Sequence, residues 1–154
     1  MFRLNALSIA IAIASNLYLT SAQALPINAL PTGGQLVQGQ ANIQQTTNQM
    51  QINQSSPKAI INWDTFNIGQ NAGVTINQPN AQASILNRVL NGSSEIAGRI
   101  NANGQVFLLN PNGILFSPTA QVNTASLVVA TGDLSDTDYI NGRGTIHNSA
   151  NGTI

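Results

Sequence analysis

The chain has 154 residues, which is the length of one ordinary domain. Charged residues make up 6% of it and the formal net charge is zero, so the chain lacks the basic surface that binding nucleic acid requires. Cysteine is absent, which excludes disulfides, thiolate metal sites and a cysteine nucleophile. The 21 Asn and 14 Gln supply most of the polarity, and Gly, Thr, Val and Ile are abundant. This composition predicts an all-β fold of short strands joined by tight turns.

The N-terminus has the three parts of a secretory signal peptide in the right order. Met1–Asn5 is positively charged, Ala6–Leu19 is mostly apolar, and Ser21–Ala24 ends in a small-x-small cleavage pattern. An amphipathic N-terminal helix is the alternative. We predict a signal peptide over residues 1–24 and a mature domain over residues 25–154. No later stretch has the 18 or so apolar residues that a membrane span needs.

Short β-like strings follow a segment that cannot be helical. Leu25–Gly39 is rich in Pro and Gly and is predicted to be a leading segment or N-terminal cap. The strings predicted as strands are Ile60–Trp63, Val74–Asn77, Ile85–Val89, Ile96–Ala102, Val106–Asn110, Ile114–Phe116 and Leu127–Thr131. Val106–Leu109 and Leu127–Ala130 are continuously apolar, which is typical of strands covered on both faces.

Two arrangements of these strands are compatible with local turn chemistry. Five Asn-Gly pairs punctuate the chain, and the pair Asn103-Gly104 between two apolar strings is the best candidate for an antiparallel hairpin in a β-sandwich. Against this, Gly144–Ile146 recurs as Gly152–Ile154, and stacked coils would line up Asn side chains in ladders that explain so many amides. We therefore predict a parallel β-helix.

Candidate residues for catalysis are few. His147 is the only histidine and has no nucleophile signature around it, so a Ser-His-Asp triad is not expected. Asp133, Asp136 and Asp138 form a carboxylate cluster of the kind that can hold calcium or act as acid and base in a polysaccharide-cleaving β-helix. Their spacing matches no calcium loop, and the Gly, Ser and Thr around them indicate a solvated loop. The sequence thus predicts no metal site, no cofactor and no enzyme activity.

Two arginines stand out in a chain with so little charge. Arg88 and Arg99 can each bind an anionic ligand, but isolated arginines more often pair with a carboxylate or with backbone carbonyls. Glu95 is the candidate partner.

The sharpest local signal is the run Asn110, Pro111, Asn112 and Gly113. Asn at the first position, Pro at the second and Gly at the fourth are the preferences of a type I turn. The run lies between two apolar strings, so it predicts a corner that ends one strand and restarts the chain at the next.

In its surroundings this corner resembles a known family. The strings that carry the resemblance are INWDTFNIG (Ile61–Gly69), LNRV (Leu86–Val89), IAGRI (Ile96–Ile100) and ANGQVFLLNPNGI (Ala102–Ile114). Together they resemble the N-terminal secretion domain of filamentous haemagglutinin-like exoproteins, the two-partner secretion family, and are closest to its high-molecular-weight adhesin branch. The resemblance covers residues Gly39 to Ala130, with the motifs in the expected order.

The resemblance implies specific site residues. Asn110, Pro111, Asn112 and Gly113 match the family's secretion motif; Trp63, Phe66 and Asn67 match its first signature block; Asn87, Arg88 and Val89 match its second. A further motif of part of the family, Asn-Pro-Asn-Leu, is absent here, which fits the adhesin branch and leaves the transporter-contacting surface less completely defined.

The resemblance also implies a fold, a route and partners. The fold is a right-handed parallel β-helix with an N-terminal β cap. The chain is expected to reach the periplasm, to be recognised by the periplasmic POTRA domains of a dedicated outer-membrane transporter, and to fold outside the cell as a template for later coils. It is then the secretion-targeting start of a longer adhesin- or haemagglutinin-like exoprotein, secreted or held at the cell surface, whose downstream repeats would bind a host or cell-surface receptor.

Two other readings stay open at this level. A β-helix enzyme acting on polysaccharides needs an acidic cleft. A β-sandwich carbohydrate-binding module needs antiparallel strand pairing.

Overall fold

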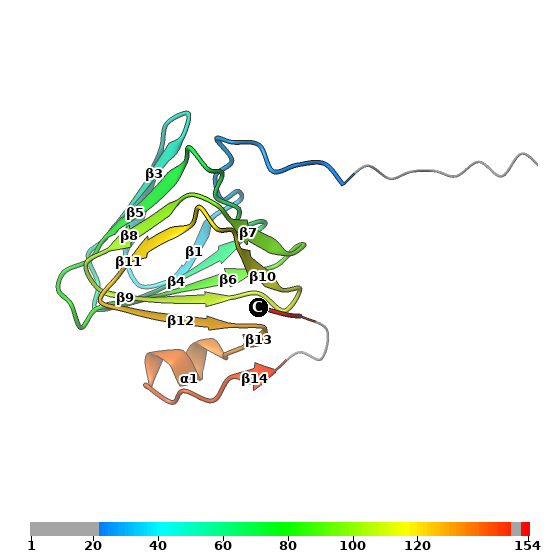
Figure 1. Ribbon diagram of the computed structural model, residues 1–154. Coiled ribbons are helices and arrows are strands. Elements are labelled where there is room, and N and C mark those ends of the chain that lie inside the picture. Colours follow the sequence, from blue (N-terminus) through cyan, green and yellow to red (C-terminus); the bar gives the residue numbers. More distant parts are fainter. Residues whose placement is uncertain (1–21, 149–151) are drawn as a thin grey trace, which may run out of the picture.

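Residues 22–148 and 152–154, which the computed structural model describes, form a right-handed parallel β-helix (Figure 1). Most of the predicted signal peptide, residues 1–21, lies outside the described residues, so that part of the sequence analysis stays a prediction.

The first face of the β-helix is a five-stranded sheet in the order β1-β4-β6-β9-β12. Its strands are β1 (Gln35–Gln38), β4 (Lys58–Trp63), β6 (Ser84–Val89), β9 (Gln105–Leu109) and β12 (Ser126–Ala130). β4, β6, β9 and β12 are parallel, and each comes from the next turn of the chain. The predicted strands on this face are confirmed to within two residues at their ends.

The second and third faces complete each turn. The second sheet contains β2 (Ala41–Gln45), β3 (Gln49–Gln54), β5 (Gly73–Asn77), β8 (Arg99–Ala102) and β11 (Gln121–Asn123). The third contains β7 (Ser94–Ile96) and β10 (Ile114–Phe116), with Ile68 bridged to Ile96 one turn earlier. Met50, Val74, Ile100 and Val122 stand in one register column, so a turn takes about 22 to 26 residues.

Antiparallel strands cap the N-terminal end, as predicted. β1 pairs antiparallel with β4, and β2 pairs antiparallel with β3. The leading segment before them lies along the first turn, where Gly69 N–H donates to Ala29 O at 2.9 Å and Asp64 N–H donates to Thr32 O at 2.9 Å. The cap therefore covers the backbone and side chains that the first turn would otherwise expose.

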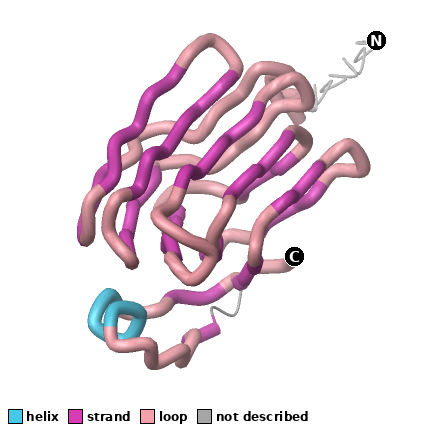
Figure 2. Tube along the Cα trace, turned by 90° about the vertical axis from the view of Figure 1, so that its left-hand side faces the viewer, coloured by secondary structure: helices cyan, strands magenta, loops and turns pink. Residues whose placement is uncertain are grey.

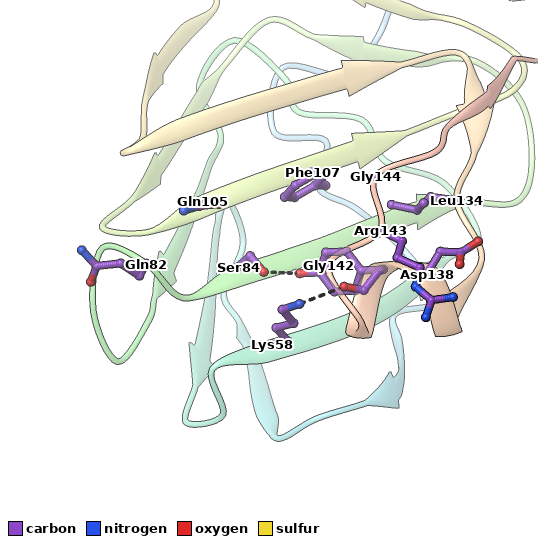
Figure 3. A pocket seen from close by; sticks show the side chains of 11 residues that line it. Lys58, Gln82, Ser84, Gln105, Phe107, Leu134, Asp138, Gly142, Arg143 and Gly144 are labelled. Atoms are coloured by element: carbon purple, nitrogen blue, oxygen red, sulfur yellow. Dashed lines mark hydrogen bonds between the residues drawn. The ribbon is translucent and has the colours of Figure 1, made fainter.

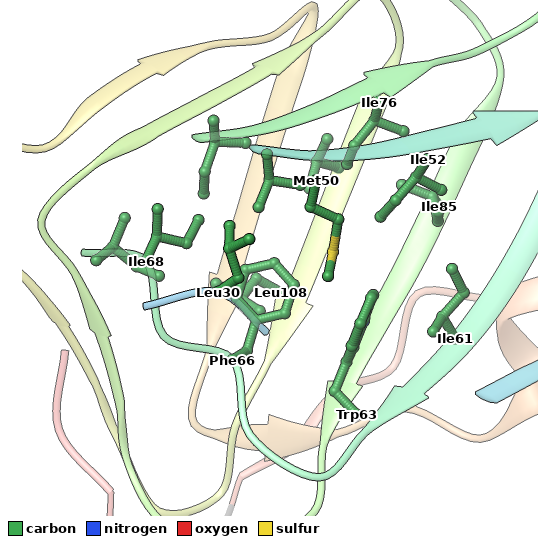
Figure 4. Packing of buried hydrophobic residues seen from close by; sticks show 14 of the residues in the cluster. Leu30, Met50, Ile52, Ile61, Trp63, Phe66, Ile68, Ile76, Ile85 and Leu108 are labelled. Atoms are coloured by element: carbon green, nitrogen blue, oxygen red, sulfur yellow. The ribbon is translucent and has the colours of Figure 1, made fainter. Parts of the chain in front are cut away.

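The interior is a single column of buried apolar side chains (Figure 4). Isoleucine from successive turns is its commonest residue, and the alternation of inward and outward residues along each strand puts these side chains there. Trp63 and Phe66 close one side of the column in an edge-to-face pair, with ring centroids 5.6 Å apart.

A C-terminal segment covers the outside of the first sheet. Residues 131–148, called the strap below, contain β13 (Gly132–Asp133), the helix α1 (Asp136–Ile140) and β14 (His147–Asn148), which pairs antiparallel with β13. Leu134 and Tyr139 of the strap are buried in a second cluster with Ile60, Leu86 and Leu109. The helix lies below the stacked strands in Figure 2. β9 is thus covered on both faces, as its apolar run predicted.

The alternative hairpin around Asn103-Gly104 is not formed. β8 and β9 flank this pair but lie in different sheets, each bonded to the turns before and after it. A Cβ on Gly104 would lie 2.6 Å from Ala83 O and from the Gln78 amide, so the glycine serves a close approach between turns rather than a hairpin. The predicted string Ile96–Ala102 is likewise broken by a corner into β7 and β8. The β-sandwich is therefore excluded.

The two observations that favoured stacking have different outcomes. The two Gly-Thr-Ile copies do not stack as successive coils, because Gly144–Ile146 runs into β14 of the strap, whereas Thr153 O accepts from Ile114 N–H at 2.9 Å. Amide stacking is confirmed at one corner. Asn77 Nδ2 donates to Asn53 Oδ1 at 2.8 Å, and Gln78 Nε2 donates to Gln54 Oε1 at 3.2 Å.

Candidate functional site

The run from Asn110 to Gly113 forms the corner between β9 and β10. Gly113 N–H donates to Asn110 O at 3.1 Å and closes the turn, and Asn112 N–H donates to Asn110 Oδ1 at 2.9 Å. Gly113 has φ of +107°, a backbone conformation that residues with a Cβ rarely adopt. The predicted turn is confirmed, and its glycine is required by the backbone.

Asn110 has its side chain inside the molecule. It is fully buried, and its Nδ2 donates to Gly92 O at 3.0 Å and to Ser94 Oγ at 2.9 Å. Both acceptors belong to the corner of the preceding turn. Asn110 therefore holds two successive corners together and is not available to another molecule.

Asn112 has the opposite environment. Its side chain is exposed, and within the described part of the chain it makes no hydrogen bond. Pro111, which precedes it, is half-buried, and Leu115, the middle residue of the strand that follows the corner, is exposed. Among the described residues, the corner thus presents an exposed amide without a side-chain hydrogen bond, on a backbone that Asn110 holds in place.

Two of the three residues of the first signature block are part of the core. Trp63 and Phe66 are each 1% exposed, and Trp63 Nε1 donates to Asn87 Oδ1 at 3.0 Å. Asn67 Oδ1 accepts from the backbone N–H of Glu95 at 2.8 Å, which ties the third face of one turn to the next. These three residues build the fold.

The second signature block is divided between the interior and the outer face. Asn87 and Val89 point inward, and Asn87 Nδ2 donates to Phe107 O at 3.2 Å, which satisfies a fully buried amide. Arg88 lies between them on the strand and so points outward, toward the strap.

Arg88 binds the carboxylate cluster of the strap. Its Nε donates to Asp133 Oδ1 at 2.8 Å, and its Nη2 donates to Asp136 Oδ1 at 2.8 Å and to Leu134 O at 2.6 Å. Its Nη1 donates to Asn62 Oδ1 at 3.0 Å. Burial alone would lower the pKa of Arg88, but the hydrogen bonds and charges of Asp136 and Asp133 outweigh it, so its pKa is raised and the guanidinium stays protonated.

This arrangement corrects two expectations. Glu95 is not the partner of Arg88; its carboxylate accepts from Ser117 Oγ at 3.1 Å. The aspartates are not a free solvated loop either, because Arg88 engages Asp133 and Asp136. Asp138 Oδ2 instead accepts from Ser135 Oγ at 2.9 Å, at the N-cap of α1.

The remaining candidates stay apart from one another. Arg99 is exposed and makes no ion pair within the described residues, and His147 is exposed on β14. Over residues 22–148 and 152–154, no group of His, Asp and Glu side chains is arranged to hold a metal ion. The acidic cleft that a polysaccharide-active enzyme needs is not formed by the aspartate cluster, since two of its members pair with Arg88. The same part of the chain contains no helix long and apolar enough to cross a membrane.

A cavity of about 200 Å³ lies between the strap and the first sheet (Figure 3). Lys58 Nζ donates to Tyr139 O at 3.0 Å and to Ile140 O at 2.7 Å, and Tyr139 Oη donates to Ser84 Oγ at 2.7 Å. Burial raises the pKa of Tyr139 to about 12, and the hydrogen bond to Ser84 opposes only part of that effect. Sequence reasoning missed these residues; the one signal was an aromatic residue in an otherwise polar segment.

Comparison with known proteins gives one consistent result. The family model described as the TPS secretion domain matches residues 22–154. Two proteins of Haemophilus influenzae named heme/hemopexin-binding protein are 39% identical over 135 residues (87% of this chain) and 43% identical over 106 residues (68% of this chain). The chain spans only 14% and 11% of their lengths. The crystal structure of the HMW1 secretion domain from Haemophilus influenzae superimposes with a TM-score of 0.74 at 36% identity, over 78% of this chain and 32% of that one.

Proposed function

This chain belongs to the family of TPS secretion domains, the two-partner secretion family, and on that premise we propose that it is the export signal recognised by a cognate outer-membrane transporter. The proposed route is removal of the leader, passage through the periplasm, and binding to the POTRA domains of the transporter before release at the cell surface. The relatives are named for secretion and binding and not for catalysis, which supports a non-enzymatic role.

The observation that carries this proposal is the contrast between Asn110 and Asn112. Both lie in the run that matches the family's secretion motif, but Asn110 is fully buried and hydrogen-bonded, whereas Asn112 is exposed with no partner for its side chain in the described residues. A short polar group on a rigid corner keeps its full hydrogen-bonding capacity for another molecule. We assign contact with the transporter to Asn112 and support of the corner to Asn110.

The parallel β-helix supports a mechanism of export coupled to folding. Each turn bonds to the previous one through strands about 4.8 Å apart, so a chain that emerges from its N-terminus can add turns one at a time. While it is unfolded in the periplasm, the same strands can add to the edges of the transporter's domains. Folding outside then favours outward movement without a nucleotide.

The cargo is proposed to lie beyond this domain. The relatives named for binding heme and hemopexin are about seven to nine times longer than the matched region, and the match covers only 32% of the chain in the HMW1 secretion-domain structure. We expect downstream repeats with adhesin-like or host-ligand-binding activity, and a receptor that those repeats contact.

Export of single-residue variants tests the proposal. Asn112→Ala is expected to reduce secretion about tenfold without changing the melting temperature, because it removes only an exposed amide. Asn110→Ala is expected to reduce secretion through the fold, with a free energy of unfolding lower by about 1–3 kcal/mol.

Asn123→Ala is the matched control, since Asn123 is an exposed asparagine on β11 of another face. Secretion into the medium, immunoblotting of the periplasm and thermal denaturation of purified protein give the three readouts. Normal secretion of Asn112→Ala, or an equal defect in Asn123→Ala, would contradict the assignment.

A further inference from the structure

The strap leaves the β-helix after β12 but makes its polar contacts with much earlier turns. Arg88, which binds Asp133, Asp136 and Leu134 O, lies on β6, two strands before β12 in the sheet. These bonds join residues 45 to 48 positions apart. The strands β4, β6, β9 and β12 belong to the first, second, third and fourth turns of the β-helix. The strap therefore crosses β9 on the outside of the sheet to reach the second turn.

A second set of contacts reaches the first turn. Lys58 lies on β4, and its Nζ donates to two carbonyl oxygens at the C-terminal end of α1, which carry the partial negative charge of the helix. These bonds join residues 81 and 82 positions apart. The Nζ also lies 5.7 Å from the centroid of the Tyr139 ring.

The strap also covers an apolar row that runs across the turns. Ile60 on β4, Leu86 on β6 and Leu109 on β9 point outward, and Leu134 and Tyr139 bury them. Phe107 packs edge-to-face on Tyr139, with ring centroids 5.5 Å apart. In a β-helix without the strap, this apolar row would be exposed to water. The strap thus connects the first and second turns to the part of the chain that follows β12.

We propose that the strap is a clasp that locks the first two turns of the β-helix after the fourth has formed, and that Arg88 and Lys58 close it. The order of events rests on the proposed export function. A chain that is exported from its N-terminus delivers the strap after the turns that the strap locks. Early turns stay reversible during export and become fixed when residues 131–148 arrive.

Hydrogen exchange with mass spectrometry on the purified chain tests the clasp independently of export. In Arg88→Gln we expect exchange to increase about tenfold in the strap and also in β4 and β6, whereas β5 and β8 on the second face change less than about threefold. The matched control is Arg99→Gln, which removes an exposed arginine with no ion pair in the described residues.

A second variant keeps the test valid if Arg88→Gln does not fold. The double variant Asp133→Asn/Asp136→Asn changes side chains that are 60% and 39% exposed and leaves Arg88 in place. It is expected to give the same pattern, with Asp64→Asn as its control.

The outcomes separate clearly. Faster exchange confined to the strap would overturn the lock, because the strap would then be a passive cover. A uniform increase over all strands would show a loss of global stability, and no change in the variants, or an equal change in Arg99→Gln, would show that the ion pairs do not close the strap. Since none of these readouts involves secretion, they are independent of the result for Asn112.

Discussion

At the scale of residues, most of the positions that match the family signature act inside the fold. Trp63, Asn87 and Asn110 are buried polar or aromatic groups with hydrogen-bond partners, and each joins one turn to the next. A buried polar group without a hydrogen-bond partner is costly, and these groups find their partners only when neighbouring turns are correctly aligned. Each of these hydrogen bonds therefore favours one register between turns. Asn67, Arg88 and Asn112 are the signature positions whose polar side chains do not point into the interior.

Gly104→Ala tests the close approach between turns. The added Cβ would lie 2.6 Å from the backbone oxygen of Ala83, so the backbone must move, and we expect the free energy of unfolding to fall by about 1–3 kcal/mol. Gly144→Ala is the control, because nothing lies within 4 Å of its Cβ position. Urea denaturation followed by the fluorescence of Trp63, the only tryptophan, measures both. Equal stability of the two variants would refute the steric argument.

At the scale of elements, the strap and the first sheet depend on each other. β9 has apolar residues on both faces, so its sequence requires an outer cover, and α1 is too short to be stable without the sheet. Leu134 and Tyr139 satisfy both requirements with the same contacts. The structure of the strap therefore depends on its contacts with the first sheet.

Ionisation of Tyr139 reports whether the strap is seated. Its pKa is raised to about 12 in the folded chain from 10.0, so the neutral phenol is favoured by the fold. The stability it contributes is complete below about pH 10 and is lost as pH rises through about 12. Without residues 1–24 it is the only tyrosine, so ultraviolet titration of phenolate reads it directly.

We expect a midpoint near 12 in the native chain and near 10 in urea. The Tyr139→Phe variant should show no phenolate signal and less dependence of strap exchange on alkaline pH. A native midpoint near 10 would mean that the phenol is in water and the strap is open.

At the scale of the whole molecule, charge is scarce and locally concentrated. The chain has five basic and five acidic residues, and three of the ten form the Arg88 ion pairs on one outer face. The amides replace charge elsewhere and stack between turns without the repulsion that like charges in register would cause. The ion pairs of residues 22–148 and 152–154 therefore all lie at the strap, and the stacked turns themselves contain none.

The described end of the predicted leader takes no part in the core. Residues 22–24 are exposed, and Leu30 is the first buried residue of the described chain. We expect exported material to begin at Leu25 and to melt at the same temperature as a chain expressed without residues 1–24. Mass spectrometry of exported protein gives the first residue; an intact Met1 there would contradict the signal peptide.

The sequence by itself determined the fold class, most strands, the Asn110–Gly113 turn and membership of the two-partner secretion family, which the comparison confirms. These depend on local chemistry: apolar periodicity, turn preferences and motif order act over a few residues. The tertiary structure alone decided which strands pair, that Asn103-Gly104 is a corner, and that Arg88 binds Asp133 and Asp136 instead of Glu95. The pairings of β5 with β8 and of β6 with β9, and the Arg88 ion pairs, join residues 21 to 48 positions apart, and no local preference specifies a partner at that separation.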